Sequence, residues 1–259
     1  MNLYRTIVIA INVFREVIRD RVLYLIALFA IGFFIAARLL PALSASTQNQ
    51  ITLDVGLAGM NLLGLLIAIF VGTGLVNKEI EKKTVSVLIA KPISRAEFIV
   101  GKHLGLSAVL AVLMLSMLIV YLFVVWFQGI PTPVGSLIIA VLFQILELSL
   151  VTAVAILFGV FTSSLLATLL TLAVYLMGQL SRDLLSFAQL IQNATIEFFS
   201  RGLYLILPDL SRLNLKNQAV YGMELLPTSS ELLSNALYAI VYIGLLLALA
   251  TFIFSRRQF

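Results

Sequence analysis

The chain has 259 residues, of which 61% are hydrophobic and only 11% are charged. A soluble domain is about 45–50% apolar and about 25% charged, so this composition indicates a membrane protein with one transmembrane domain over residues 1–259. The absence of cysteine excludes disulfides, thiolate metal sites and cysteine nucleophiles. The net charge of +5 is explained by basic residues near one membrane face, so no nucleic-acid partner is expected.

The first element is expected at residues 1–21, where apolar side chains recur at helical spacing. They are Leu3, Ile7, Ile11, Phe14 and Ile18. Charged residues occupy the other faces, as in an amphipathic helix at a membrane interface. The apolar run that follows, 22–39, resembles the core of a cleaved signal peptide. It is longer than the usual core of about 7–15 residues, so we interpret it as the first span.

Six apolar runs approach or exceed the roughly 20 residues that a helix needs to cross the hydrocarbon core. They are residues 22–39, 57–76, 104–127, 137–161, 165–180 and 235–254. The polar stretch Ala42–Gly56 is expected to be an external loop. Most of the 17 Lys and Arg residues then lie in segments on the cytoplasmic side, which places both termini there. The expected fold is an all-α polytopic membrane protein with six transmembrane helices.

Residues 77–103 form a densely charged connection between the second and third spans. Thr84–Ala90 has the apolar spacing of a short amphipathic helix. Pro92 should end that helix, because the residue before a proline is disfavoured in the helical region. Ser94 followed by Glu97 has the spacing of a capping box, which predicts the start of the next helix. On charge alone, this connection is equally a solvated loop whose lysines only set the topology.

The order of residues in this connection resembles the signature between the second and third spans of ABC-2-type permeases. The matching residues are Glu79-Ile80-Glu81, Thr84, Lys91-Pro92-Ile93-Ser94-Arg95 and Gly101-Lys102. In that family the segment is the coupling helix, which sits in a groove of a separate ATP-binding subunit. The resemblance implies a type V exporter-like permease in a prokaryotic cytoplasmic membrane. It also implies two permease chains, identical or different, working with two ATPase subunits.

The resemblance further implies which residues transmit force from the ATPase. They are Glu79, Glu81, Thr84, Val85, Leu88, Ile89, Lys91, Pro92, Ser94 and Arg95. No catalytic residue is expected in this chain, because it contains neither GxxxxGK[ST] nor GxGxxG. ATP and magnesium would therefore be bound by the partner ATPase, and the permease itself would hold no cofactor.

Three stretches most resemble the ABC-2 permeases linked with multicopper-enzyme maturation. They are KEIEKKT, KPISRAEFIVGK and the later LPDLSRLNLKNQAVYG. The implied function is ATP-driven export, with the substrate undefined. The alternative is a complex that moves no solute and transmits ATP-driven motion to a periplasmic or extracellular partner protein.

Outside the coupling connection, a few polar residues are candidates for function. Glu147 lies in the middle of the fourth span, where a carboxylate is disfavoured unless it faces a helix interface or a wet cavity. It is a candidate intramembrane polar site or a hydrogen-bonded structural residue. Arg182 and Asp183 are either the solvated end of the fifth span or an external gate. His103, at the start of the third span, is expected to be an interfacial polar residue.

The mixed stretch 181–233 is expected to form an external cap of short, partly re-entrant helices. Its length exceeds what a connection between neighbouring spans needs, and its apolar pieces are too short to cross the membrane. The apolar residues should pack on the outer ends of the fifth and sixth spans, with the charged residues facing outward. They are Phe198, Phe199, Leu203, Tyr204 and Leu207.

Overall fold

The computed structural model describes residues 2–19, 23–39, 48–81, 94–181, 200 and 202–256, and these residues contain helices and no strand. The longer helices are α1 (Leu3–Val17), α2 (Leu23–Leu39), α3 (Gln48–Glu81), α5 (Arg95–Phe127), α6 (Val134–Phe161), α7 (Ser164–Gln179) and α11 (Ser229–Arg256). Between α7 and α11 lie helical residues 202–206 and the short helices η3 (Leu210–Arg212), α10 (Lys216–Ala219) and η4 (Met223–Leu225). The all-helical fold expected from the sequence is therefore confirmed.

Four of the described helices are long and apolar enough to cross a membrane: α3, α5, α6 and α11. The other two expected spans correspond to α2 and α7, which are apolar but shorter. At about 1.5 Å per residue, the 16 residues of α7 extend about 24 Å, less than the roughly 30 Å of a hydrocarbon core. The six-span layout therefore stays a prediction.

The polar stretch before the second span is a helix over much of its length, which corrects the expected external loop at residues 42–56. Helix α3 already begins at Gln48. Thr52 and Leu53 are buried, and the Tyr121 hydroxyl donates a 3.2 Å hydrogen bond to the Leu53 carbonyl oxygen. Packing against α5 thus stabilises a helical turn that its polar composition alone does not predict. At the other end of the chain, α11 begins at Ser229, within the stretch assigned to the cap.

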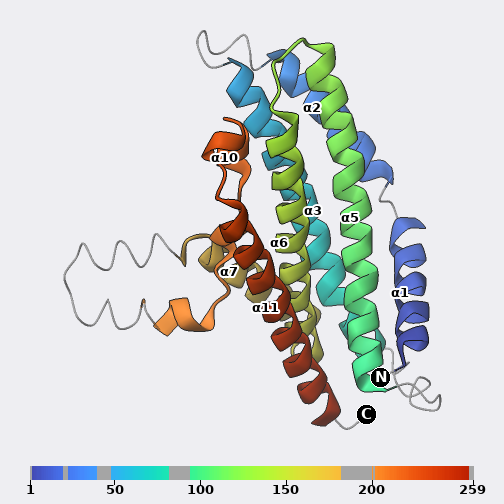
Figure 1. Ribbon diagram of the computed structural model, residues 1–259. Helices are drawn as coiled ribbons and strands as arrows, with labels where there is room; N and C mark the ends of the chain where they lie inside the picture. Colours follow the sequence, from blue (N-terminus) through green and yellow to red (C-terminus); the bar gives the residue numbers. More distant parts are fainter. Residues whose placement is uncertain are drawn as a thin grey trace.

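Helix α6 lies at the centre of the bundle and is the most buried of the four long helices. Figure 1 shows α3 and α5 beside it, α7 and α11 on one side, α1 on the far side of α5, and α2 crossing behind α5 in contact with α3. Small residues permit close contact between α3 and α6: a Cβ on Gly159 would lie 3.0 Å from the Thr73 carbonyl oxygen. The first turn of α5 lies at the end of the bundle that also carries both chain termini (Figure 1).

Helix α1 runs alongside the first half of α5 (Figure 1). It packs through Thr6, Val13 and Val17, which are buried, and leaves Leu3 and Ile7 exposed. Leu3, Ile7 and Ile11 of the apolar stripe are exposed, whereas Phe14 and Ile18 pack against the core, so a second face completes the docking surface. That face is available because Gly101 and Gly105 present no side chain to it.

Helix α7 ends beside the middle of α6, and an irregular segment continues in its place. Gln179, the last residue of α7, donates a hydrogen bond to Glu147 at the midpoint of α6. From there, residues 207–219, here called the 207–219 segment, follow α6 until the Ser136 hydroxyl donates to the Ala219 carbonyl oxygen at 2.6 Å. Helix α6 thus covers this segment with protein, which is the condition under which non-helical backbone is tolerated inside a membrane.

Candidate functional sites

The first turn of α5 joins three helices, and we call Ser94, Arg95, Glu97 and Phe98 the α5 junction. Ser94 and Glu97 form the capping box that the sequence predicts, with the Ser94 backbone nitrogen 2.9 Å from Glu97 Oε2. The other carboxylate oxygen, Oε1, accepts a 2.5 Å hydrogen bond from the backbone nitrogen of Asn2. Glu97 thus fastens the start of α1 to the start of α5.

Arg95 connects the same turn to the end of α11. Its guanidinium donates to the carbonyl oxygens of Phe254, at 3.2 Å, and of Ser255. A cation is favourable at these carbonyls, because the last turn of a helix leaves them without intrahelical partners. The Phe98 and Phe254 rings stack with their centroids 5.7 Å apart. Arg95, expected to face the ATPase, therefore binds within its own chain.

Most of the other residues expected to transmit force lie outside the described residues: Thr84, Val85, Leu88, Ile89, Lys91 and Pro92. Glu79 and Glu81 belong to the last turns of α3, and only their backbone is described. The structure nonetheless fixes what flanks the expected coupling helix. The connection that should contain the coupling helix follows Glu81, the last residue of α3, and ends at Ser94, the N-cap of α5. The first turn of α5 there contacts both α1 and α11.

A second candidate site is a buried polar cluster formed by Asn61, Glu147, Tyr175, Gln179 and Asn214. Glu147 has no exposed surface. The amide nitrogen of Gln179 donates to Glu147 Oε1 at 2.5 Å, and the Asn214 amide donates to Gln179 Oε1 at 3.0 Å. Asn61 donates to the Tyr175 hydroxyl at 3.2 Å. The cluster therefore joins α3, α6, α7 and the 207–219 segment where α7 ends.

Sequence reasoning identified Glu147 but missed the rest of the cluster. Gln144 and Glu147 are spaced i, i+3 in an apolar run and share one helix face, but Gln144 donates to the Leu57 carbonyl oxygen at 3.4 Å, so this spacing does not point to the other members of the cluster. Lys216 is the nearby cation: burial lowers its pKa, and the Glu147 carboxylate opposes that shift. Since Lys216 lies in a segment with no helical periodicity, its depth could not be read from the sequence.

The charged residues of the cap do not all face outward, which corrects the expectation. Asp209 is only 2% exposed and accepts hydrogen bonds from Ser181, Ser211 and Arg212. Arg212 Nε lies 3.0 Å from Asp209 Oδ2, and its guanidinium also stands over the Tyr238 ring of α11. Hydrogen bonds from the Arg212 guanidinium to the Tyr204 hydroxyl, at 3.2 Å, and to Asp209 raise the pKa of Arg212, and these contacts hold the 207–219 segment between α7 and α11.

Of the apolar cap residues expected to pack on the bundle, Leu203 is 40% exposed, whereas Tyr204 and Leu207 are half-buried. Leu205 and Ile206, which were not expected to pack, are about twice as exposed as Leu203. Phe198 and Phe199, together with the candidate gate residues Arg182 and Asp183, lie outside the described residues.

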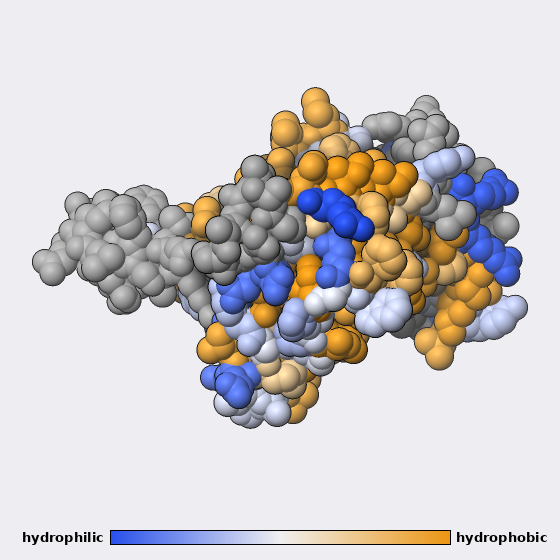
Figure 2. Space-filling model, turned by 90° about the horizontal axis from the view of Figure 1, so that it is seen from above, coloured by the Kyte–Doolittle hydropathy of each residue, from blue (hydrophilic) through white to orange (hydrophobic). Residues whose placement is uncertain are grey.

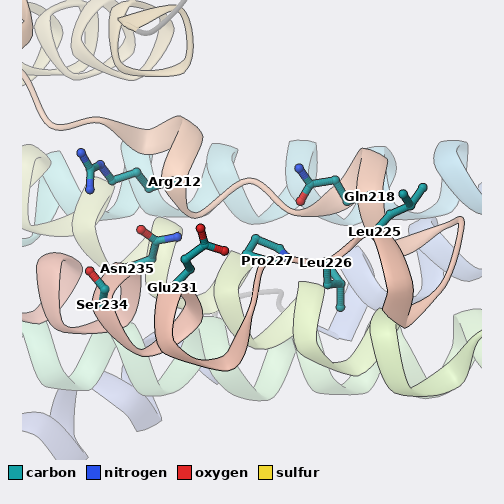
Figure 3. Close-up of a pocket in the computed structure, with 8 residues that line it drawn as sticks. All are labelled: Arg212, Gln218, Leu225, Leu226, Pro227, Glu231, Ser234 and Asn235. Carbon is teal, nitrogen blue, oxygen red and sulfur yellow. The ribbon is translucent and has the colours of Figure 1, made fainter.

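An open cavity of about 390 Å³ separates the cap from the start of α11. Figure 3 shows Glu231 and Asn235 of α11 facing the stretch that carries Arg212 and Gln218, with Leu225, Leu226 and Pro227 at one end. Because charged, amide and apolar groups all line it, the cavity suits the side chains of a partner segment better than a purely apolar ligand.

His103 is buried between α5 and α6, and its expected position at the membrane interface stays a prediction. It is 4% exposed, and its Nε2 lies 3.0 Å from the Ser149 carbonyl oxygen of α6. Within the described ranges, no three His, Cys, Asp or Glu residues are grouped so that they could hold a metal ion.

Comparison with protein families finds one matching family model, described as ABC-2 family transporter protein, over residues 7–259. The comparison with curated proteins finds no match.

Proposed function

The chain belongs to the ABC-2 family of transporter proteins, and on that premise we propose that it couples ATP hydrolysis by a separate subunit to export across a membrane. The premise makes it an integral membrane protein and the permease of an ABC transporter. ATP-driven export, the coupling residues and the orientation of the chain are the parts that we propose.

The α5 junction is the observation that carries the coupling mechanism. The expected coupling helix enters α5 at Ser94, and within one turn Glu97 binds the backbone of Asn2 and Arg95 binds the last carbonyls of α11. A displacement of the coupling helix would therefore move α1, α5 and α11 together. Rigid helices joined by hydrogen bonds transmit such a displacement better than a free loop.

Family membership implies an ABC ATPase partner and a dimeric membrane assembly. We propose that ATP and magnesium bind to the ATPase, so that this chain is neither an enzyme nor a cofactor carrier. Both termini would be cytoplasmic, because they share the end of the bundle with the α5 junction (Figure 1), and the membrane would be the prokaryotic cytoplasmic membrane.

One observation favours a second function, the transmission of motion to an external partner protein without solute movement. The end opposite the termini carries Tyr221, Met223 and Leu225, each more than half exposed, beside the open cavity. Figure 2 views this end and shows hydrophobic residues over much of its described surface, with hydrophilic patches between them. Exposed aromatic and apolar groups of this kind are typical of protein interfaces.

Purification of the tagged chain with its partners tests the proposal. An ATPase subunit should copurify, and the complex reconstituted in lipid should hydrolyse ATP faster than the isolated ATPase. If the ATPase does not copurify and its rate is the same with and without the permease, the proposal is wrong. If a secreted protein copurifies and is required for the stimulation of ATP hydrolysis, the second function, transmission of motion to an external partner, is supported instead.

A further inference from the structure

Glu147 is a carboxylate without exposed surface in the middle of a membrane helix. An ionised carboxylate at such a depth costs several kcal/mol unless it is hydrogen-bonded and paired with a positive charge. The residues around Glu147 should therefore provide hydrogen bonds and a positive charge.

The hydrogen bonds around Glu147 are directed as an ionised carboxylate requires. Asn214 donates to Gln179, and Gln179 in turn donates to Glu147 Oε1. An ionised carboxylate is only an acceptor, so this chain of amides satisfies one of its oxygens. The other oxygen, Oε2, is buried and has no hydrogen-bond partner among the described residues.

Lys216 is the cation placed to compensate this charge. It begins α10, which packs against α6, and it follows Asn214 of the amide chain by two residues. The two charged groups influence each other, although these two described side chains form no hydrogen bond in this conformation. A lysine has a flexible four-carbon stem and three donors, so its ammonium can reach an unsatisfied oxygen by a change of rotamer.

We propose that Lys216 is the counter-charge of Glu147 and that this pair, with Gln179 and Asn214, holds the 207–219 segment against α6 at the depth where α7 ends. Among its described residues the segment has only short helical turns, so contacts within the bundle must hold it in place. The Asp209 network anchors the same segment nearer to α7 and α11, and the Ser136 contact anchors its far end.

Cysteine reactivity can test the pair, because the natural chain has no cysteine. The reporter is Ala219→Cys: Ala219 has no exposed surface, and its small side chain tolerates the change. In lipid nanodiscs the reporter should react slowly with a water-soluble maleimide. Lys216→Met should raise that rate about tenfold or more, because it leaves a buried charge uncompensated. The matched control, Asn217→Met, changes an exposed neighbour on the same short helix and should leave the rate unchanged.

The double variant Glu147→Gln with Lys216→Met decides the case. With both charges removed, the reporter rate should return to within about twofold of the parent, because a neutral pair has no charge to compensate. Glu147→Gln alone should have the smaller effect, since a lone Lys216 can extend toward water. An unchanged rate in Lys216→Met, or a double variant as reactive as the single one, would overturn the proposal.

Thermal unfolding of the same samples separates release of the segment from loss of the whole fold. If the labelling rate of the reporter rises only in variants that are already unfolded at the labelling temperature, the proposed charge pair is not supported. The measurement uses no ATP and no ATPase, so failure of the charge pair and failure of the proposed transport function are distinguishable.

Discussion

Glu97 accepts a hydrogen bond from the backbone nitrogen of Asn2, 95 positions away in the chain. The same carboxylate caps its own helix through Ser94. One side chain therefore holds the first residues of α1 at the point where the expected coupling helix enters α5.

Glu97→Gln should weaken this junction. The amide keeps one acceptor oxygen but loses the charge that strengthens both hydrogen bonds, so we expect the midpoint of thermal unfolding to fall. Thermal unfolding in nanodiscs measures it. Glu224→Gln is the matched control, because Glu224 is exposed and should change stability by less than about 0.5 kcal/mol. Equal effects of the two changes would refute the fastening role of Glu97.

Gly105→Ala should loosen α1 from α5. A Cβ at this position would lie 2.6 Å from the Ala10 carbonyl oxygen, a backbone atom that cannot move aside by itself. We expect a loss of about 1–3 kcal/mol and faster hydrogen exchange at residues 6–17. Gly244→Ala is the control: a Cβ there meets nothing within 4 Å, and alanine suits a helix better than glycine. Unaltered exchange in α1 would show that the close approach is not required.

Leu88→Glu should uncouple the permease from its ATPase without preventing membrane insertion. If Leu88 docks in an apolar groove, the new carboxylate is buried without a partner, which costs several kcal/mol of binding. The assay is permease-stimulated ATP hydrolysis in the reconstituted complex, and the prediction is a loss of at least about tenfold in stimulation. Leu88→Met, which preserves apolar volume, should retain it. Full stimulation by the glutamate variant would remove Leu88 from the coupling surface.

Asp209→Asn should release the cap. Asp209 is buried and paired with Arg212, so its neutralisation leaves a partly buried arginine without its ion pair. We expect a cost of about 2–4 kcal/mol, visible as faster proteolysis between residues 202 and 225. Glu224→Gln, a carboxylate change at an exposed residue of the cap, is the comparison. Equal proteolysis of the parent and the Asp209 variant would contradict the anchoring role.

Single cysteines at Asn217 and Glu224 should react with an impermeant thiol reagent added outside intact cells. Asn217 and Glu224 are suitable because both side chains are exposed. Arg212 is less suitable because it forms an ion pair with Asp209. A cysteine at Ser255, at the end of the bundle near the termini, should react only after the membrane is opened. The reverse pattern would overturn the proposed orientation.

The sequence by itself determined the class of this protein. Composition and the length of its apolar runs indicate a helical membrane protein, because a lipid-exposed backbone must satisfy its hydrogen bonds within the helix. Local rules also placed the start of α5, since the Ser94 and Glu97 capping box depends only on neighbouring residues. The resemblance in the connection between α3 and α5 agrees with the family match.

Only the tertiary structure decided which residues meet across the bundle. Polarity predicted a loop at residues 42–56, but its part from Gln48 onward is helical and packs on α5. Arg95, identified as a residue for an external partner, binds the end of α11, and Asp209, expected to face outward, is buried in a network. Such contacts join residues far apart in the chain. Local periodicity carries no information about them, because each depends on which elements the fold brings side by side.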